Sequence, residues 1–214
     1  MASPLRRLRS ALEARTHAWI RRRQGIDPEP LRLHRGRIYI LPTALGLAYA
    51  TMVFAMVLGA LNYGNNLGLG LAFLLASLGL VTMHHCHGTL SGLEIRLTGA
   101  ESAFAGRDVA FRLLLVNPSL APRPRIELNV GQQPPSIADV PAAGSASATL
   151  ALRAQHRGRV PLARYQVATR HPLGLFRAWT VWKPAARALA WPRPETPLAP
   201  WPASPSAAGQ AAQQ

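Results

Sequence analysis

Residues 38–93 read IYILPTALGLAYATMVFAMVLGALNYGNNLGLGLAFLLASLGLVTMHHCHGTLSGL and contain no Lys, Arg, Asp or Glu. An apolar run of about 18 residues is enough for a helix to cross the hydrocarbon core of a bilayer. The polar, turn-forming residues 62–66, NYGNN, divide this run in two. We therefore predict a transmembrane hairpin over residues 38–87, with spans at about 38–61 and 67–83. A buried hairpin in a soluble core is the alternative, but neither segment has the polar face that such a helix shows to water.

Small residues recur at four-residue intervals along the second span. They are Gly64, Gly68, Ala72 and Ala76. Small side chains allow two helix backbones to approach closely in lipid, so this stripe is expected to pack against the first span. The first span offers two pairs of small residues for that contact: Ala44 with Ala48, and Ala55 with Gly59. Chance is the alternative explanation, because Gly and Ala are abundant in this chain.

The chain of 214 residues carries a net charge of +15, and all but one of its 24 basic residues, Lys183, are Arg. Such a charge favours an anionic partner, either nucleic acid or a membrane surface. The hairpin makes the lipid bilayer the expected partner. Nucleic acid is not expected, because no recognisable nucleic-acid fold accompanies the arginines. The single cysteine, Cys86, excludes an internal disulfide and fits a domain in a reducing compartment.

Residues 1–37 form a strongly basic segment with ten Arg, three acidic residues and a net charge of +7. Leu5, Leu8, Leu12 and Trp19 approximate helical spacing, which predicts a basic amphipathic helix on anionic lipid. The basic residues expected to face lipid are Arg21, Arg22, Arg23, Arg35 and Arg37. An organellar transit peptide is also Arg-rich, but the two spans that follow favour a bacterial membrane protein.

Positive charge flanks the hairpin on both sides and is absent from its tip. The flanking residues are Arg21, Arg22, Arg23, Arg32, Arg35 and Arg37 before it, and Arg96, Arg107 and Arg112 after it. Loops rich in Lys and Arg stay on the cytoplasmic side of a membrane. We therefore predict a multi-pass protein of the bacterial inner membrane with both termini in the cytoplasm.

Four potential metal ligands follow one another after the second span: His84, His85, Cys86 and His87. Imidazole and thiolate suit zinc or copper. Adjacent residues of a helix or strand point in different directions, however, and no second cluster completes a coordination sphere. We predict no metal and no cofactor, with these residues at headgroup level and Gly88 ending the helix. A metal-linked or redox-linked membrane protein that uses this cluster is the alternative function.

Beyond residue 88 the apolar pattern changes from helical to alternating. Leu93, Ile95 and Leu97 alternate with polar residues, as in a strand with one buried face. Similar short segments predict six or seven strands over residues 88–195, with a Pro/Gly/Ser-rich loop at 131–146. The segments are 93–98, 109–115, 125–130, 150–152, 160–169, 179–182 and 187–191. The predicted fold is an all-β, immunoglobulin-like antiparallel sandwich that follows the hairpin.

Three motifs in this region carry a family resemblance. They are Asn117-Pro118, Arg157-Gly158-Arg159 and the stretch from Thr169 to Trp179, TRHPLGLFRAW. Together with the hairpin, and with Leu90-Ser91-Gly92-Leu93, they resemble the N-terminal half of bacterial DUF58 membrane proteins over residues 35–195. DUF58 proteins are often encoded beside MoxR-type AAA+ ATPases. The resemblance therefore implies a MoxR-type ATPase partner and a role in assembling or maturing other proteins.

The chain departs from the family pattern after Glu195. DUF58 proteins usually continue into the DUF58 domain proper, whereas residues 196–214 form a Pro/Ala/Ser/Gln-rich tail that is expected to be disordered. The expectation is either a truncated product, which would be a non-functional fragment, or a short form that keeps only the anchor and the sandwich.

The predicted function is a non-enzymatic scaffold that presents the sandwich to other membrane proteins. No paired carboxylates are placed for acid and base chemistry, no Ser lies in a nucleophile elbow, and no small-molecule substrate is indicated.

The candidate partner-binding residues are Arg170, Pro172, Phe176, Arg177 and Trp179, whose types include those enriched in interface hot spots. A structural alternative is that this loop shapes a corner while Leu173, Leu175 and Phe176 plug the base of the sandwich. A second basic group consists of Arg153, Arg157, Arg159 and Arg164. These arginines either contact phospholipid or are solvated strand positions.

Overall fold

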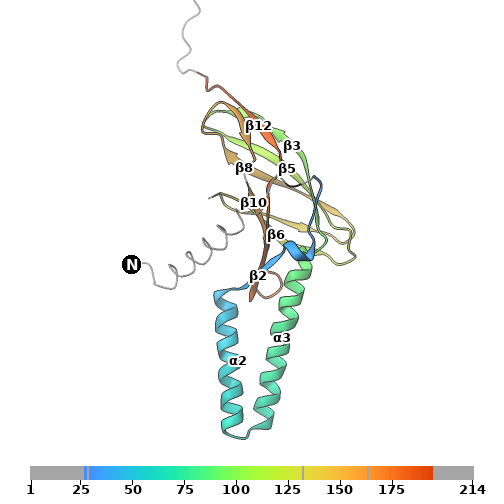
Figure 1. Ribbon diagram of the computed structural model, residues 1–214, viewed down its shortest axis with the longest axis vertical. Helices are drawn as coiled ribbons and strands as arrows, with labels where there is room; N and C mark the ends of the chain where they lie inside the picture. Colours follow the sequence, from blue (N-terminus) through green and yellow to red (C-terminus); the bar gives the residue numbers. More distant parts are fainter. Residues whose placement is uncertain (1–26, 28, 132, 163, 195–214) are drawn as a thin grey trace, which may run out of the picture.

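The computed structural model of the protein describes residues 27, 29–131, 133–162 and 164–194. Two long antiparallel helices extend from one end of a β-rich domain (Figure 1). Helix α2 spans Ala44–Asn62 and helix α3 spans Asn66–Leu90. The predicted fold class, a helical hairpin followed by a β-sandwich, is confirmed.

Both helices begin at a side-chain cap. Thr43 Oγ1 accepts a hydrogen bond from the Gly46 amide, and Asn65 Oδ1 accepts one from the Gly68 amide. At 1.5 Å per residue, α2 is about 28 Å long and α3 about 37 Å. Both helices are long and apolar enough to cross a membrane.

The start of the first span differs from its prediction at Ile38. Residues Tyr39–Pro42 form strand β2, which pairs with strand β11, Phe176–Trp182. This pairing satisfies the backbone of an apolar segment without a helix, and α2 starts only after Pro42 and the Thr43 cap. The basic segment also ends earlier than predicted, because Leu31–Arg32 form strand β1 of the sandwich.

The second span is longer than predicted. Helix α3 continues through the histidines and past Gly88 to Leu90. Glycine inside a helix costs about 1 kcal/mol relative to alanine. Burying a leucine side chain contributes about 2 kcal/mol, and Leu90 is fully buried in the sandwich core. The final turns of α3 are therefore held by the sandwich.

The small-residue stripe of α3 partly faces α2. Ala72 is fully buried, and Gly68 and Ala76 are half-buried. A Cβ atom added to Gly68 would lie 3.5 Å from the Ala60 side chain. Gly64 does not belong to this face, because it lies in the turn between the helices with φ of 60°.

The face of α2 in the hairpin also differs from the prediction. Ala44, Ala48 and Ala55 are exposed, whereas the buried residues of α2 are Gly46, Val53 and Ala60. These three positions repeat at seven-residue intervals and share one helical face. The phase of this face was ambiguous in the sequence, because small and apolar residues surround the whole helix.

Three sheets build the sandwich. The four-stranded sheet has the order β1-β3-β5-β8, with β3 Glu94–Glu101, β5 Asp108–Val116 and β8 Ser145–Arg153. The five-stranded sheet has the order β2-β11-β10-β6-β7, with β10 Tyr165–Thr169, β6 Arg123–Val130 and β7 Ser136–Val140. The three-stranded sheet has the order β4-β12-β9, with β4 Ala103–Phe104, β12 Arg187–Trp191 and β9 Gly158–Pro161. Paired strands are antiparallel in the described chain, apart from the parallel pair of β4 and β12.

One core joins the sheets. Its fully buried side chains include Phe111, Leu113, Ile126, Leu128 and Trp182. Two strand predictions were wrong in detail. The loop expected at 131–146 contains β7, and the single strand expected at 160–169 is divided between β9 and β10 of different sheets. Pro161 ends β9, because proline has no amide hydrogen with which to extend a ladder.

Candidate functional site: the junction between the hairpin and the sandwich

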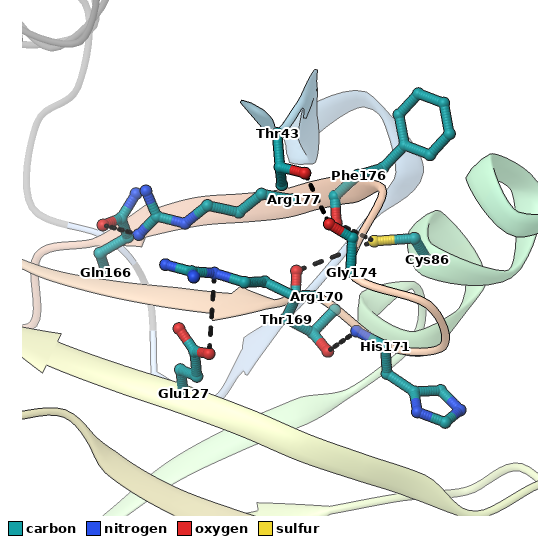
Figure 2. A network of polar contacts seen from close by, with 10 residues as sticks. All are labelled: Thr43, Cys86, Glu127, Gln166, Thr169, Arg170, His171, Gly174, Phe176 and Arg177. Carbon is teal, nitrogen blue, oxygen red and sulfur yellow. Dashed lines mark hydrogen bonds and ion pairs between the residues drawn. The ribbon is translucent and has the colours of Figure 1, made fainter. Parts of the chain in front are cut away.

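Helix α3 enters the sandwich at its C-terminal end, where it packs against β6, β10 and β11. The side chain of Cys86 is 1% exposed and points at the ends of β10 and β11. Its Sγ lies 3.5 Å from the Phe176 carbonyl oxygen and 3.8 Å from that of Thr169, and the thiol donates toward both (Figure 2). A small side chain here lets the helix lie directly against the strand backbones.

Helix α2 meets the same region through its cap. Thr43 Oγ1 donates to the Gly174 carbonyl oxygen at 2.6 Å (Figure 2). The Thr43 amide donates to the Leu175 carbonyl oxygen at 2.8 Å. Gly174 has φ of 71°, a conformation that favours glycine, and its amide donates to the Arg170 carbonyl oxygen. The loop of residues 170–175, between β10 and β11, is thus fixed to the start of α2.

A buried arginine closes the end of α3. Arg123, the first residue of β6, is 6% exposed. Its Nη1 donates to the carbonyl oxygens of Thr89 at 2.8 Å and Gly88 at 3.2 Å, and its Nε donates to Asn117 Oδ1 at 2.6 Å. The last carbonyl groups of a helix have no hydrogen-bond donor within the helix and carry partial negative charge. The Arg123 guanidinium supplies both the hydrogen-bond donors and the opposite charge. Burial lowers the pKa of Arg123, but an arginine stays charged in proteins.

Asn117 extends this contact to two loops. Its Nδ2 donates to the carbonyl oxygens of Ala121 and Pro141, each at 2.9 Å. From the sequence, Asn117-Pro118 is identified only as a motif of the family resemblance. In the fold, the Asn117 side chain positions the guanidinium that holds α3.

The segment before α2 runs beside the exit of α3. The Leu33 amide donates to the Leu93 carbonyl oxygen at 2.9 Å, and the Gly92 amide donates to that of Leu33 at 2.7 Å. The chain therefore enters and leaves the hairpin as two neighbouring extended segments, both hydrogen-bonded within the sandwich. These contacts add to those of Thr43, Cys86 and Arg123 in fixing the hairpin to the sandwich.

Of the basic residues expected to face lipid, two are described. Arg37 Nη2 lies 2.7 Å from Asp27 Oδ1, and Asp27 Oδ2 accepts a hydrogen bond from the Lys183 amide. Arg37 therefore has a structural partner, in contrast to its predicted free contact with lipid. Arg35 is exposed next to the end of α3, where its carbonyl oxygen lies 3.4 Å from His87 Nε2. The remaining three, Arg21, Arg22 and Arg23, lie outside the described residues, as does the tail 196–214.

The predicted partner-binding residues do not form one exposed surface. Trp179 is 3% exposed and lies against Tyr39, with ring centroids 5.0 Å apart, so its predicted role as a surface contact is wrong in this fold. Arg177 Nη2 donates to Gln166 Oε1 at 3.1 Å, and Phe176 is half-buried (Figure 2). Arg170 and Pro172 remain exposed at the loop.

The alternative prediction, in which Leu173, Leu175 and Phe176 plug the base of the sandwich, holds only in part. Leu175 is buried where the loop meets α2, whereas Leu173 is exposed and plugs nothing. Arg170 Nε lies 3.9 Å from Glu127 Oε1, an ion pair on the open side of the sheet (Figure 2). The loop thus has one face for the hairpin and one face for solvent.

The four residues His84 to His87 diverge around α3. Cys86 faces the strands, His87 faces the Arg35 carbonyl oxygen, and His84 and His85 are exposed. Within the described ranges, no group of three His, Cys, Asp or Glu residues is arranged to hold a metal ion.

Glu94 is the acidic residue of the segment that leaves α3. It lies between Arg96, at 2.6 Å, and Arg32, at 3.2 Å, and joins β3 to β1. The hydrogen bond from Arg96 and the charges of both arginines lower the pKa of this carboxyl.

We expect acid to weaken this junction through Glu94. A carboxyl with a lowered pKa in the folded protein stabilises the fold above its unfolded-state pKa, and that contribution disappears as the pH falls through the folded-state pKa. Unfolding midpoints measured from neutral to acidic pH should therefore fall less steeply for Glu94→Gln than for the natural protein. Glu101→Gln is the control. Glu101 lies at the other end of β3 from Glu94, and its exposed carboxylate pairs with Arg112 of β5. Identical pH profiles for Glu94→Gln and the natural protein would contradict this role.

A scan against models of known protein families finds no match for this chain, and a search of curated proteins finds no related sequence. The resemblance to DUF58 proteins therefore stays a prediction from the motifs quoted above. What this protein does is inferred from the junction and from the surfaces that the sandwich exposes.

Proposed function

We propose that this chain is a non-enzymatic scaffold of the bacterial inner membrane, in which a two-span hairpin holds a cytoplasmic sandwich at a fixed orientation. The observation that carries this proposal is the continuity of α3, which runs from an apolar span into the sandwich core without a linker. Thr43, Cys86 and Arg123 add contacts from α2, α3 and β6 at the same level. A flexible tether would need none of these contacts.

The benefit of such an anchor is a high effective concentration. A domain held next to the bilayer meets membrane-bound partners as if in one molecule, which strengthens weak contacts. A rigid junction also presents the same face of the domain to every partner. The exposed residues of the 170–175 loop, Arg170 and Pro172, lie in the loop that is fixed to the start of α2 and form the surface we assign to such a partner.

The partner class follows from the family resemblance, which suggests a MoxR-type AAA+ ATPase and a role in assembling other proteins. The orientation follows from the arginines on both flanks of the hairpin and the uncharged tip. Anionic lipid next to Arg35 would add to the anchoring.

One experiment tests both parts of this proposal in intact cells. A photocrosslinking amino acid at Pro172 is expected to capture an AAA+ ATPase, whereas the same amino acid at Tyr63, on the hairpin tip, is not. In parallel, Tyr63→Cys should react with a membrane-impermeant maleimide from outside, because Tyr63 is 84% exposed. The buried native Cys86 keeps the background low.

The two readouts fail separately. Labelling of Tyr63→Cys only after permeabilisation would overturn the orientation. Labelling from outside, combined with no ATPase crosslink at Pro172, would overturn the partner class and leave the anchor in place.

A further inference from the structure

The three-stranded sheet β4-β12-β9 exposes a face that is both apolar and basic. Along β12, Ala188 and Ala190 point into the core, while Leu189 and Trp191 are 40% and 51% exposed. The register places Phe104, which is 45% exposed, beside Trp191. Three large apolar side chains thus lie together on the outside of one small sheet.

Arginines surround this apolar patch. Arg159 pairs in register with Leu189, and Arg187 begins β12. A pocket of about 540 Å³ at Phe104 is lined by three more arginines: Arg107, Arg153 and Arg193. In the described part of the chain, none of these five arginines forms an ion pair within 4.0 Å. Asp108, at the start of β5, follows Arg107 and is the register partner of Arg153, without an ion pair between them.

This surface lies at the far end of the sandwich from the hairpin. Strand β12 is near the top of Figure 1, whereas α2 and α3 extend from the opposite end. A bilayer that holds the hairpin is therefore out of reach of this surface. Contact with phospholipid, one of the two alternatives for Arg153 and Arg159, does not fit this arrangement. These arginines are open to a counterpart from the aqueous phase.

We propose that this distal surface, formed by Phe104, Leu189, Trp191 and the five arginines, binds an acidic amphipathic peptide segment of a soluble partner. Guanidinium groups bind carboxylates through two parallel hydrogen bonds, and Trp and Arg are enriched in interface hot spots. The apolar patch covers the apolar side chains of the same segment. A nucleic acid fits less well, because its phosphate backbone offers no aliphatic counterpart to Leu189. The inference rests on the proposed function in that the anchored sandwich keeps this surface away from the bilayer, and it adds a soluble partner to the one assigned to the 170–175 loop.

The test uses the purified full chain in detergent and a short fluorescein-labelled peptide of alternating Glu and Leu. Binding is expected, and it should weaken with added salt because exposed charges are screened. Arg153→Gln and Trp191→Ala should each weaken it by about tenfold, the loss typical of a hot-spot residue. Arg125→Gln, which removes one exposed arginine from the membrane-proximal β6, is the matched control and should leave the affinity unchanged.

Three outcomes would overturn the inference. An equal loss in Arg125→Gln would indicate unspecific attraction by net charge. Equal binding of a Glu and Ser peptide would remove the role of the apolar patch. Tighter binding of oligothymidylate, lost in Arg153→Gln, would assign the surface to nucleic acid. None of these results changes the maleimide labelling at Tyr63 or the crosslink at Pro172, so failure here is distinct from failure of the proposed scaffold.

Discussion

Replacing Arg123 with Met is expected to lower the free energy of unfolding by about 3 kcal/mol, because it leaves one buried and two part-buried acceptors without their donor. The acceptors are the carbonyl oxygens of Gly88 and Thr89 and the Asn117 side chain. Methionine keeps most of the aliphatic stem, so the loss does not come from a large cavity. The free energy of unfolding of Arg123→Lys should lie between those of the natural protein and Arg123→Met, because an ammonium keeps the charge near the end of α3 but loses the planar fork of the guanidinium.

Arg125→Met is the matched control for this substitution. Arg125 lies two residues along the same strand with its side chain exposed, and its replacement should change the free energy of unfolding by less than about 0.5 kcal/mol. Urea unfolding of the full chain in detergent, followed by tryptophan fluorescence, measures both variants, because Trp182 lies in the core. Equal midpoints for Arg123→Met and Arg125→Met would show that the guanidinium does not hold the helix.

The elements with strong periodicity could be predicted from sequence. The two spans and most strands follow from long apolar runs and from alternation such as that of Leu93, Ile95 and Leu97. The start of α2 could not, because residues 38–41 are apolar enough for either a span or a buried strand. Their pairing with β11 decides for the strand. Likewise Gly88 was interpreted as a helix end on local propensity, which burial of Leu90 overrides.

The junction was harder to predict, because its contacts join distant parts of the chain. Thr43 and Gly174 are separated by 131 residues, and Arg123 and Thr89 by 34. No local pattern distinguishes Arg123 from the other arginines of this Arg-rich chain. The motif from Thr169 to Trp179 contributes residues to the junction, but its side chains divide between the hairpin, the sheet and solvent.

Gly46→Ala is expected to lower the free energy of unfolding by about 2 kcal/mol through overpacking against the 170–175 loop. A Cβ atom on Gly46 would lie 2.9 Å from the Leu175 carbonyl carbon and closer still to its oxygen. The obstacle is backbone that Thr43 also holds by hydrogen bonds, so it cannot move aside without loss of the α2 cap. Alanine normally favours a helix over glycine by about 1 kcal/mol, which makes a loss at this position diagnostic.

Gly59→Ala, in the same helix, is expected to change the free energy of unfolding in the opposite direction. No atom lies within 4 Å of a Cβ added there, so stability should rise by as much as about 1 kcal/mol. Limited trypsin digestion adds a local readout, because displacement of the loop by Gly46→Ala should speed cleavage after the exposed Arg170, whereas Gly59→Ala should not. If both variants gained stability and cleavage after Arg170 stayed slow, the loop would not pack on α2 at Gly46. The fixed angle between hairpin and sandwich would then depend on α3 alone.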